Sequence, residues 1–126
     1  MIGFLEKNKL LSFMFVVLLL IEIFYFSTLT GGTGTAAGGN WPGRIYHFSV
    51  FFLLTFFLFI FIKGKKKINS KYIFIVLLFA FLFGVLDEIH QIFVPGRDAS
   101  FRDIFTNSLG MFCAILACFY ASKKNE

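Results

Sequence analysis

The chain has little charge, proline or cysteine. Of its 126 residues, 15% are charged, 2 are proline and 2 are cysteine, whereas an average soluble domain is about 25% charged. The apolar composition excludes a disordered chain, and the cysteine count excludes a small secreted domain held together by disulfides. Instead, 58% of the residues are hydrophobic and 21 are phenylalanine. Because a soluble domain of this size cannot bury so much apolar surface, the composition predicts a single membrane domain over residues 1–126.

Four apolar runs predict the fold class: an all-α membrane protein with four transmembrane helices in an antiparallel bundle. A helix of about 20 apolar residues crosses a bilayer. Glu22 interrupts the first run at a cost of about 3 kcal/mol, which the surrounding Leu, Ile, Phe and Val residues outweigh. A secretory signal peptide cleaved near Thr35-Ala36-Ala37 is the alternative for this run, but the run is too long for one. The predicted spans are residues 10–29, 45–62, 72–92 and 101–121.

Every lysine lies on one side of these spans. The positive-inside rule makes that side cytoplasmic, so both termini are predicted to be inside and the loops at residues 30–43 and 94–100 outside. The glycine-rich first loop is interpreted as a plain linker, with a flexible lid as the alternative. The lysine run between the second and third spans suits anionic lipids better than nucleic acid, so membrane lipids and no nucleic acid are the expected partners. The lysines are Lys7, Lys9, Lys63, Lys65, Lys66, Lys67, Lys71, Lys123 and Lys124.

The third span has to include charged residues. A helix over residues 72–86 is only about 22 Å long, which is shorter than the hydrocarbon core of a bilayer. The helix is therefore predicted to continue through residues 87–91 and to stop before Pro95-Gly96. The fourth helix is predicted to start at Ser100, with Asp103 completing a capping box.

Polar side chains from all four helices are predicted to gather in one layer near the outer end of the bundle. Ionisable groups at that depth are costly and should face the interior in pairs. Arg97 and Arg102 are the expected counter-charges, because a guanidinium group binds a carboxylate through two hydrogen bonds. Gly110 is expected to let the third and fourth helices approach closely. The candidate ligand-binding residues are Glu22, Arg44, His47, Asp87, Glu88, Gln91, Arg97, Arg102, Asp103 and Asn107.

The polar residues carry a family resemblance. The run from Asp87 to Gln91, then Pro95-Gly96-Arg97, then Asp103, Asn107 and Gly110 resembles the signature of the VanZ-like family, small bacterial membrane proteins named after a teicoplanin-resistance protein. His47-Phe48 is similar to the family's Asp-Lys-x-x-His-Phe element, although Gly43-Arg44 replaces Asp-Lys, so the acidic residue is lost. The resemblance covers nearly the whole chain. It implies a four-helix protein of the bacterial cytoplasmic membrane, associated with tolerance to lipoglycopeptide antibiotics, and it supplies no settled biochemical activity.

Three functions fit these residues. In the first, the outward-facing site binds or modifies the headgroup of a lipid or lipid-linked wall precursor, with Arg44, Arg97 and Arg102 meeting phosphate, and lowers susceptibility to antibiotics such as teicoplanin. In the second, the protein is a hydrolase or transferase acting on such a headgroup by carboxylate acid/base chemistry. Its candidate catalytic residues are Asp87, Glu88 and His90, or His47 as another proton carrier, and no nucleophile motif is present. In the third, the polar layer is a structural plug without a ligand.

A metal site is a further alternative. Asp87 and His90 are three residues apart on a helix, and His47, Glu22 or Asp103 would complete a ligand set. This pattern falls well short of a His-Glu-x-x-His motif. The prediction is therefore that the protein has no metal and no cofactor.

Overall fold

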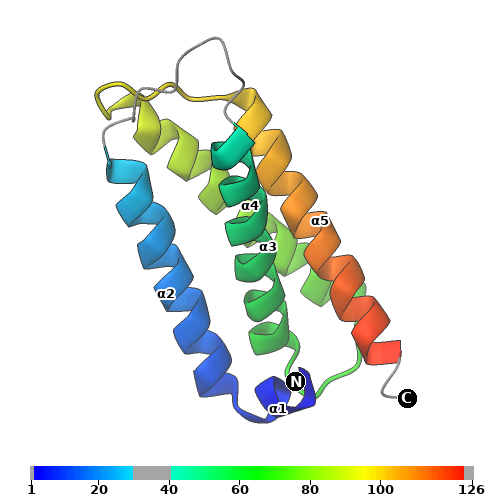
Figure 1. Cartoon of the computed structure of the whole chain (residues 1–126). Coiled ribbons are helices and arrows are strands. Elements are labelled where there is room, and N and C mark those ends of the chain that lie inside the picture. The colour runs from blue at the N-terminus through cyan, green and yellow to red at the C-terminus, as the bar shows by residue number, and fades with distance from the viewer. Residues whose placement is uncertain (1, 30–40, 124–126) are drawn as a thin grey trace.

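The computed structural model of the protein describes residues 2–29 and 41–123. In these two stretches all regular structure is helical, with no strand (Figure 1). Most of the glycine-rich loop, together with the signal-peptide cleavage site considered above, lies outside the described residues. The helices are α1 (Ile2–Lys7), α2 (Lys9–Thr28), α3 (Trp41–Lys63), α4 (Ser70–Ile92) and α5 (Phe101–Lys123).

The four long helices, α2 to α5, are each long and apolar enough to cross a membrane. This confirms the all-α class and a chain with four candidate spans. The short helix α1 was not expected, and Asn8 separates it from α2. Helix α3 begins at Trp41, before the predicted start at residue 45, because Pro42 is tolerated in the first helical turn, where its missing N–H has no partner to lose.

Glycine and polar side chains set the helix ends. Gly64 follows α3 with a φ of 54° and Gly96 lies between α4 and α5 with a φ of 77°, a region that L side chains rarely occupy. The Asn69 side chain caps α4 by accepting a hydrogen bond from the Lys71 N–H at 3.0 Å. The Ser100 hydroxyl caps α5 by accepting one from the Arg102 N–H at 3.2 Å, which confirms the predicted start of this helix.

Helix α3 is the central element of the bundle. It contacts each of the other helices, and α2 and α5 flank it in Figure 1. Its side chains form the middle of the core, where Phe51, Leu54 and Phe59 are almost completely buried. The other long helices turn large apolar side chains such as Phe74 and Phe112 outward, as expected for helices that meet lipid.

Gly110 sets the contact between α3 and α5. A Cβ atom at this position would clash with the Phe48 carbonyl oxygen and would lie 3.1 Å from the Phe52 nitrogen, both on the backbone of α3. The prediction that Gly110 brings the last two helices together is therefore wrong about the partner. On α4 the close approach is made by Gly84, where a Cβ atom would lie 3.2 Å from the Phe51 ring.

An ion pair closes the opposite end of the bundle. Lys63, at the end of α3, lies 2.6 Å from the Glu6 carboxylate of α1 and is 7% exposed. In Figure 1, α1 and the C-terminal end of α5 lie at this end, together with the connection between α3 and α4. We call it the lysine end, and we call the end where α4 leads into α5 the loop end.

The contact at Gly110 can be tested by adding one methyl group. Gly110→Ala should lower the free energy of unfolding by about 1–3 kcal/mol, because the backbone of α3 would have to move. The thermal unfolding midpoint in detergent measures the change. Gly3→Ala is the matched control, because a Cβ at Gly3 meets nothing within 4 Å and alanine is the better helix former. Equal midpoints for the two variants would contradict the tight contact.

Candidate functional site

A buried polar cluster lies at the loop end of the bundle. It contains His47 of α3, Asp87, Glu88 and Gln91 of α4, and Asn107 of α5, none more than 7% exposed. Helix α4 contributes three side chains because the spacing of residues 87, 88 and 91 places them on one helix face. Gly84 and Ala80 continue the same buried face toward the start of α4. The structure thus brings together five of the predicted ligand-binding residues.

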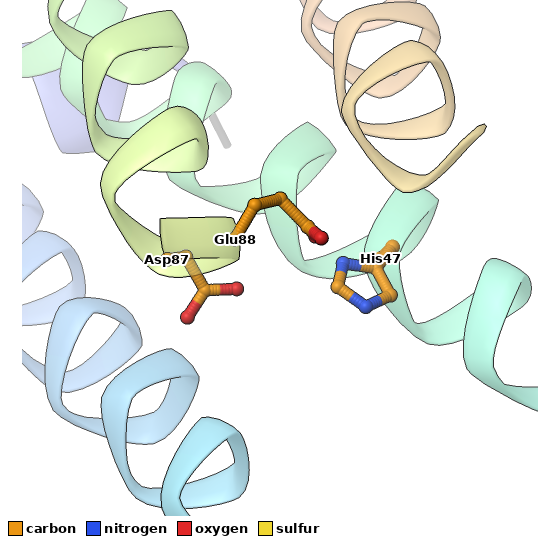
Figure 2. Close-up of side chains that lie close together, drawn as sticks. All are labelled: His47, Asp87 and Glu88. Carbon is orange, nitrogen blue, oxygen red and sulfur yellow. The ribbon is translucent and has the colours of Figure 1, made fainter. Parts of the chain in front are cut away.

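Three members of the cluster lie close enough to act on one ligand. His47, Asp87 and Glu88 each offer one nitrogen or oxygen atom, and these atoms lie within 4.8 Å of one another. Figure 2 shows the two carboxylates of α4 and the imidazole ring of α3 turned toward a common space. Donors of this kind, an imidazole and two carboxylates, can hold a metal ion or transfer protons.

Hydrogen bonds hold two of these side chains. The Asn107 Oδ1 atom lies 3.1 Å from Nδ1 of the His47 ring. The Gln91 amide donates to Oδ2 of Asp87 at 2.9 Å, as the predicted spacing of four residues allows. Asn107 and Gln91 are both neutral, so neither contact places a cation beside a carboxylate of the cluster.

Glu88 links α4 to the start of α5. Its Oε2 atom accepts a hydrogen bond from the backbone N–H of Ser100 at 2.9 Å. In a capping box that N–H would be bound by the residue three positions into the same helix, so the prediction that Asp103 does this is wrong. Glu88 also gains from the partial positive charge at the start of a helix. Sequence spacing cannot reveal this bond, because it depends on how two helices meet.

Arg97 and Arg102 do not pair with the carboxylates. The Arg97 guanidinium donates to the carbonyl oxygens of Phe26 at 2.8 Å and Leu29 at 3.2 Å, where the end of α2 leaves carbonyl groups without helical partners. Arg102 is exposed. Among the described residues, the one ion pair joins Lys63 and Glu6 at the lysine end. The prediction that the arginines pair with the carboxylates is therefore wrong.

Glu22 lies outside the cluster. It is exposed on α2, so the expectation that it faces the bundle interior is wrong. The buried face of α2 runs through Leu19, Ile23 and Ser27, and a residue next to Ile23 points about 100° away from that face.

His90 and Asp103 also lie outside the cluster. His90 is half-buried, with its ring centroid 4.9 Å from that of Phe24 and its Nε2 atom without a hydrogen-bond partner. Asp103 is half-buried near the start of α5. The donor atoms that converge among the described residues belong to His47, Asp87 and Glu88, so the predicted metal set built on Asp87 and His90 is not formed.

A groove opens between the first turns of α3 and α5. It has a volume of about 590 Å³, and we call it the arginine groove because Arg44 and Arg102 are its charged residues. The Arg44 guanidinium lies 5.3 Å from the centre of the Trp41 ring, a cation–π contact. The other lining residues are Ile45, Phe48, Phe101, Phe105, Thr106 and Leu109. The sequence identified both arginines as candidates, but not the groove, which exists only because α3 and α5 are neighbours.

A comparison with protein families gives one match. The family model described as VanZ/LLP1 matches residues 10–122, a range that contains the polar cluster and the arginine groove. Neither the curated proteins nor the solved structures compared with the chain give a match. The family resemblance drawn from the sequence motifs is confirmed.

The contacts of Arg97 and Arg102 predict different effects of their removal on stability. Arg97→Ala should lower the free energy of unfolding by about 1 kcal/mol, because it removes a cation from the carbonyl end of α2. Arg102→Ala should leave it unchanged, because this exposed side chain makes no hydrogen bond that supports the fold. Thermal unfolding in detergent measures both. A larger loss for Arg102→Ala than for Arg97→Ala would contradict these assignments.

Proposed function

The chain belongs to the VanZ/LLP1 family of membrane proteins, and from that premise we propose that it binds the phosphorylated headgroup of a lipid or lipid-linked wall precursor. The observation that carries the proposal is the pair of arginines in the arginine groove, whose other lining residues are almost all apolar. Guanidinium groups match the geometry of phosphate oxygens. Apolar walls beside them suit acyl or prenyl chains.

The depth of the groove supports a headgroup ligand. Arg44 and Arg102 lie in the first turns of two membrane-spanning helices, where water and headgroups begin. Trp41, also in the groove lining, is a residue type enriched at membrane interfaces. Phe101 and Phe105 are 90% and 65% exposed, and their rings are available to hydrocarbon chains next to the headgroup.

The lysines support an orientation. With the helices alternating in direction as an antiparallel bundle, the lysine end carries Lys63 at the end of α3 and Lys65 to Lys67 between α3 and α4. It also carries Lys7 and Lys9, where α1 meets α2. The positive-inside rule places this end in the cytoplasm together with both termini. The loop end, with the arginine groove, then faces the outside of the bacterial cytoplasmic membrane.

An outward-facing groove fits a role of the protein at the cell envelope. Glycopeptide antibiotics act on wall precursors at the outer face of the membrane, and the groove would meet precursors on that face. We place the protein there as one that lowers susceptibility to antibiotics such as teicoplanin by binding or modifying a precursor.

A second candidate function is a membrane-embedded hydrolase or transferase acting on the same headgroup. The observation that favours it is the convergence of Asp87, Glu88 and His47 within 4.8 Å, because such groups can accept and donate protons. Incubation of the purified protein with lipid-linked precursors, followed by mass spectrometry, separates the two: a changed precursor indicates the enzyme, and a retained but unchanged one indicates the binding protein.

The groove predicts which charges hold the lipid. Arg44→Gln and Arg102→Gln should each weaken retention of phosphatidylglycerol or undecaprenyl phosphate about tenfold, because each removes a charged hydrogen bond worth about 1.5–3 kcal/mol. Native mass spectrometry of the full chain in detergent measures retention. A glycolipid without phosphate should bind equally weakly to all three proteins.

Lys65→Gln is the matched control, because Lys65 is an exposed cation at the lysine end. Inorganic phosphate as competitor distinguishes recognition of the headgroup alone from recognition of the whole lipid. In cells, the wild type but not Arg102→Gln should raise tolerance to teicoplanin at equal membrane levels. If Lys65→Gln lost as much lipid as Arg102→Gln, the groove assignment would be discarded.

The orientation predicts where a cysteine can be labelled. Asp98→Cys at the loop end should react with a membrane-impermeant maleimide added to intact cells, whereas Lys65→Cys should react only after the cells are opened. Asp98 is exposed and has no positive φ, unlike Gly96. The unmodified protein is the blank, because Cys113 and Cys118 lie within a predicted span. The reverse pattern would place the groove on the cytoplasmic side.

A further inference from the structure

Two buried carboxylates share one space, and neither forms an ion pair with another described residue. Asp87 is 7% exposed and Glu88 is 2% exposed, and the atoms they offer lie within 4.8 Å of each other and of a His47 nitrogen. Among the described residues neither carboxylate has an ion-pair partner, since the Arg97 guanidinium is bound to carbonyl groups at the end of α2. Charge buried in a bilayer requires a partner, and two carboxylates are matched by a divalent cation.

Glu88 presents an unused atom to this space. Its Oε2 atom is held by the Ser100 N–H at 2.9 Å, while its Oε1 atom is buried and has no hydrogen-bond partner. A buried acceptor without a partner is costly. In Figure 2 the Glu88 carboxylate, which carries this unpartnered oxygen, points toward the His47 ring and away from its own helix.

Each of the three side chains is already held by a further group. Asn107 bonds to the His47 ring, Gln91 donates to Asp87, and the Ser100 N–H donates to Glu88. Outer hydrogen bonds of this kind orient the ligands in metal sites. The three ligands come from two helices that pack together, and so their positions are fixed by the fold.

We propose that His47, Asp87 and Glu88 bind one divalent transition-metal ion of the Zn²⁺ or Mn²⁺ class. One imidazole and two carboxylates suit these ions, whereas Ca²⁺ takes 6–8 oxygen ligands. Donors around a tetrahedral zinc ion are about 3.4 Å apart, a spacing that small side-chain rotations reach from within 4.8 Å. Three protein ligands leave a coordination position for water or a ligand oxygen. The inference does not depend on lipid binding, because neither arginine of the groove is a ligand.

The experiment is metal binding by the full chain in detergent. Protein carrying a tag without histidine is treated with EDTA, desalted, and given Zn²⁺, Mn²⁺, Mg²⁺ or Ca²⁺ separately. After gel filtration, elemental analysis should find about one Zn²⁺ or Mn²⁺ per chain, and little Mg²⁺ or Ca²⁺. The bound ion should also raise the thermal unfolding midpoint, and EDTA should reverse the rise.

Near-isosteric variants locate the ion. His47→Gln, Asp87→Asn and Glu88→Gln should each weaken metal affinity at least tenfold, and Glu88→Gln keeps an oxygen for the Ser100 N–H. The matched controls are Glu22→Gln and His90→Gln, because these side chains lie outside the cluster, and both should bind like the wild type. Equal affinity in all five variants would overturn the site.

Metal binding by the wild-type chain tests the proposal even where a variant fails to fold. A wild-type chain that binds neither Zn²⁺ nor Mn²⁺ stoichiometrically, and whose unfolding midpoint neither ion raises, would overturn the proposal. In that case the carboxylates act as a polar plug, while the lipid retention of Arg102→Gln would remain a separate result.

Discussion

The organisation of the loop end depends on one constraint: polar groups buried in a bilayer must find partners inside the protein. The bond from the Ser100 N–H to Glu88 is the clearest case. It places the last turn of α4 against the first turn of α5, satisfies a backbone donor that the start of a helix leaves open, and fixes one carboxylate oxygen. The bond between His47 and Asn107 extends the same arrangement to α3, and the bond from Gln91 to Asp87 orients the second carboxylate within α4.

The close contact of α3 and α5 connects this cluster to the groove. Gly110 lets the backbone of α5 lie against Phe48, and one turn away Asn107 reaches His47. Phe48 also lines the arginine groove, as does Arg44, one turn before it. One helix pair therefore positions both the inner polar cluster and the groove, so a change in its packing would alter the two together.

Much of this fold could be predicted from the sequence, because hydropathy and length determine the spans, and residue spacing places Asp87, Glu88 and Gln91 on neighbouring faces of one helix. The wrong predictions concern the direction in which a side chain leaves its helix and the identity of the neighbouring helix. Glu22 lies on the first long helix, as predicted, but one residue changes the direction of a side chain by about 100° on a helix, and Glu22 is exposed. The partner of Gly110 and the groove depend on which helices lie side by side, which no local pattern encodes.

The wrong expectation about the arginines bears on function. Guanidinium groups paired with Asp87 and Glu88 would have cancelled the charge of both sites, leaving a neutral bundle end with little affinity for ions. Instead, Arg97 stabilises the end of α2, and neutral donors orient the carboxylates. Neither Asp87 nor Glu88 forms an ion pair with a lysine or arginine of the described residues, while Arg44 and Arg102 line the groove. A structural plug does not require this separation, whereas the proposed metal site and the proposed lipid site both depend on it.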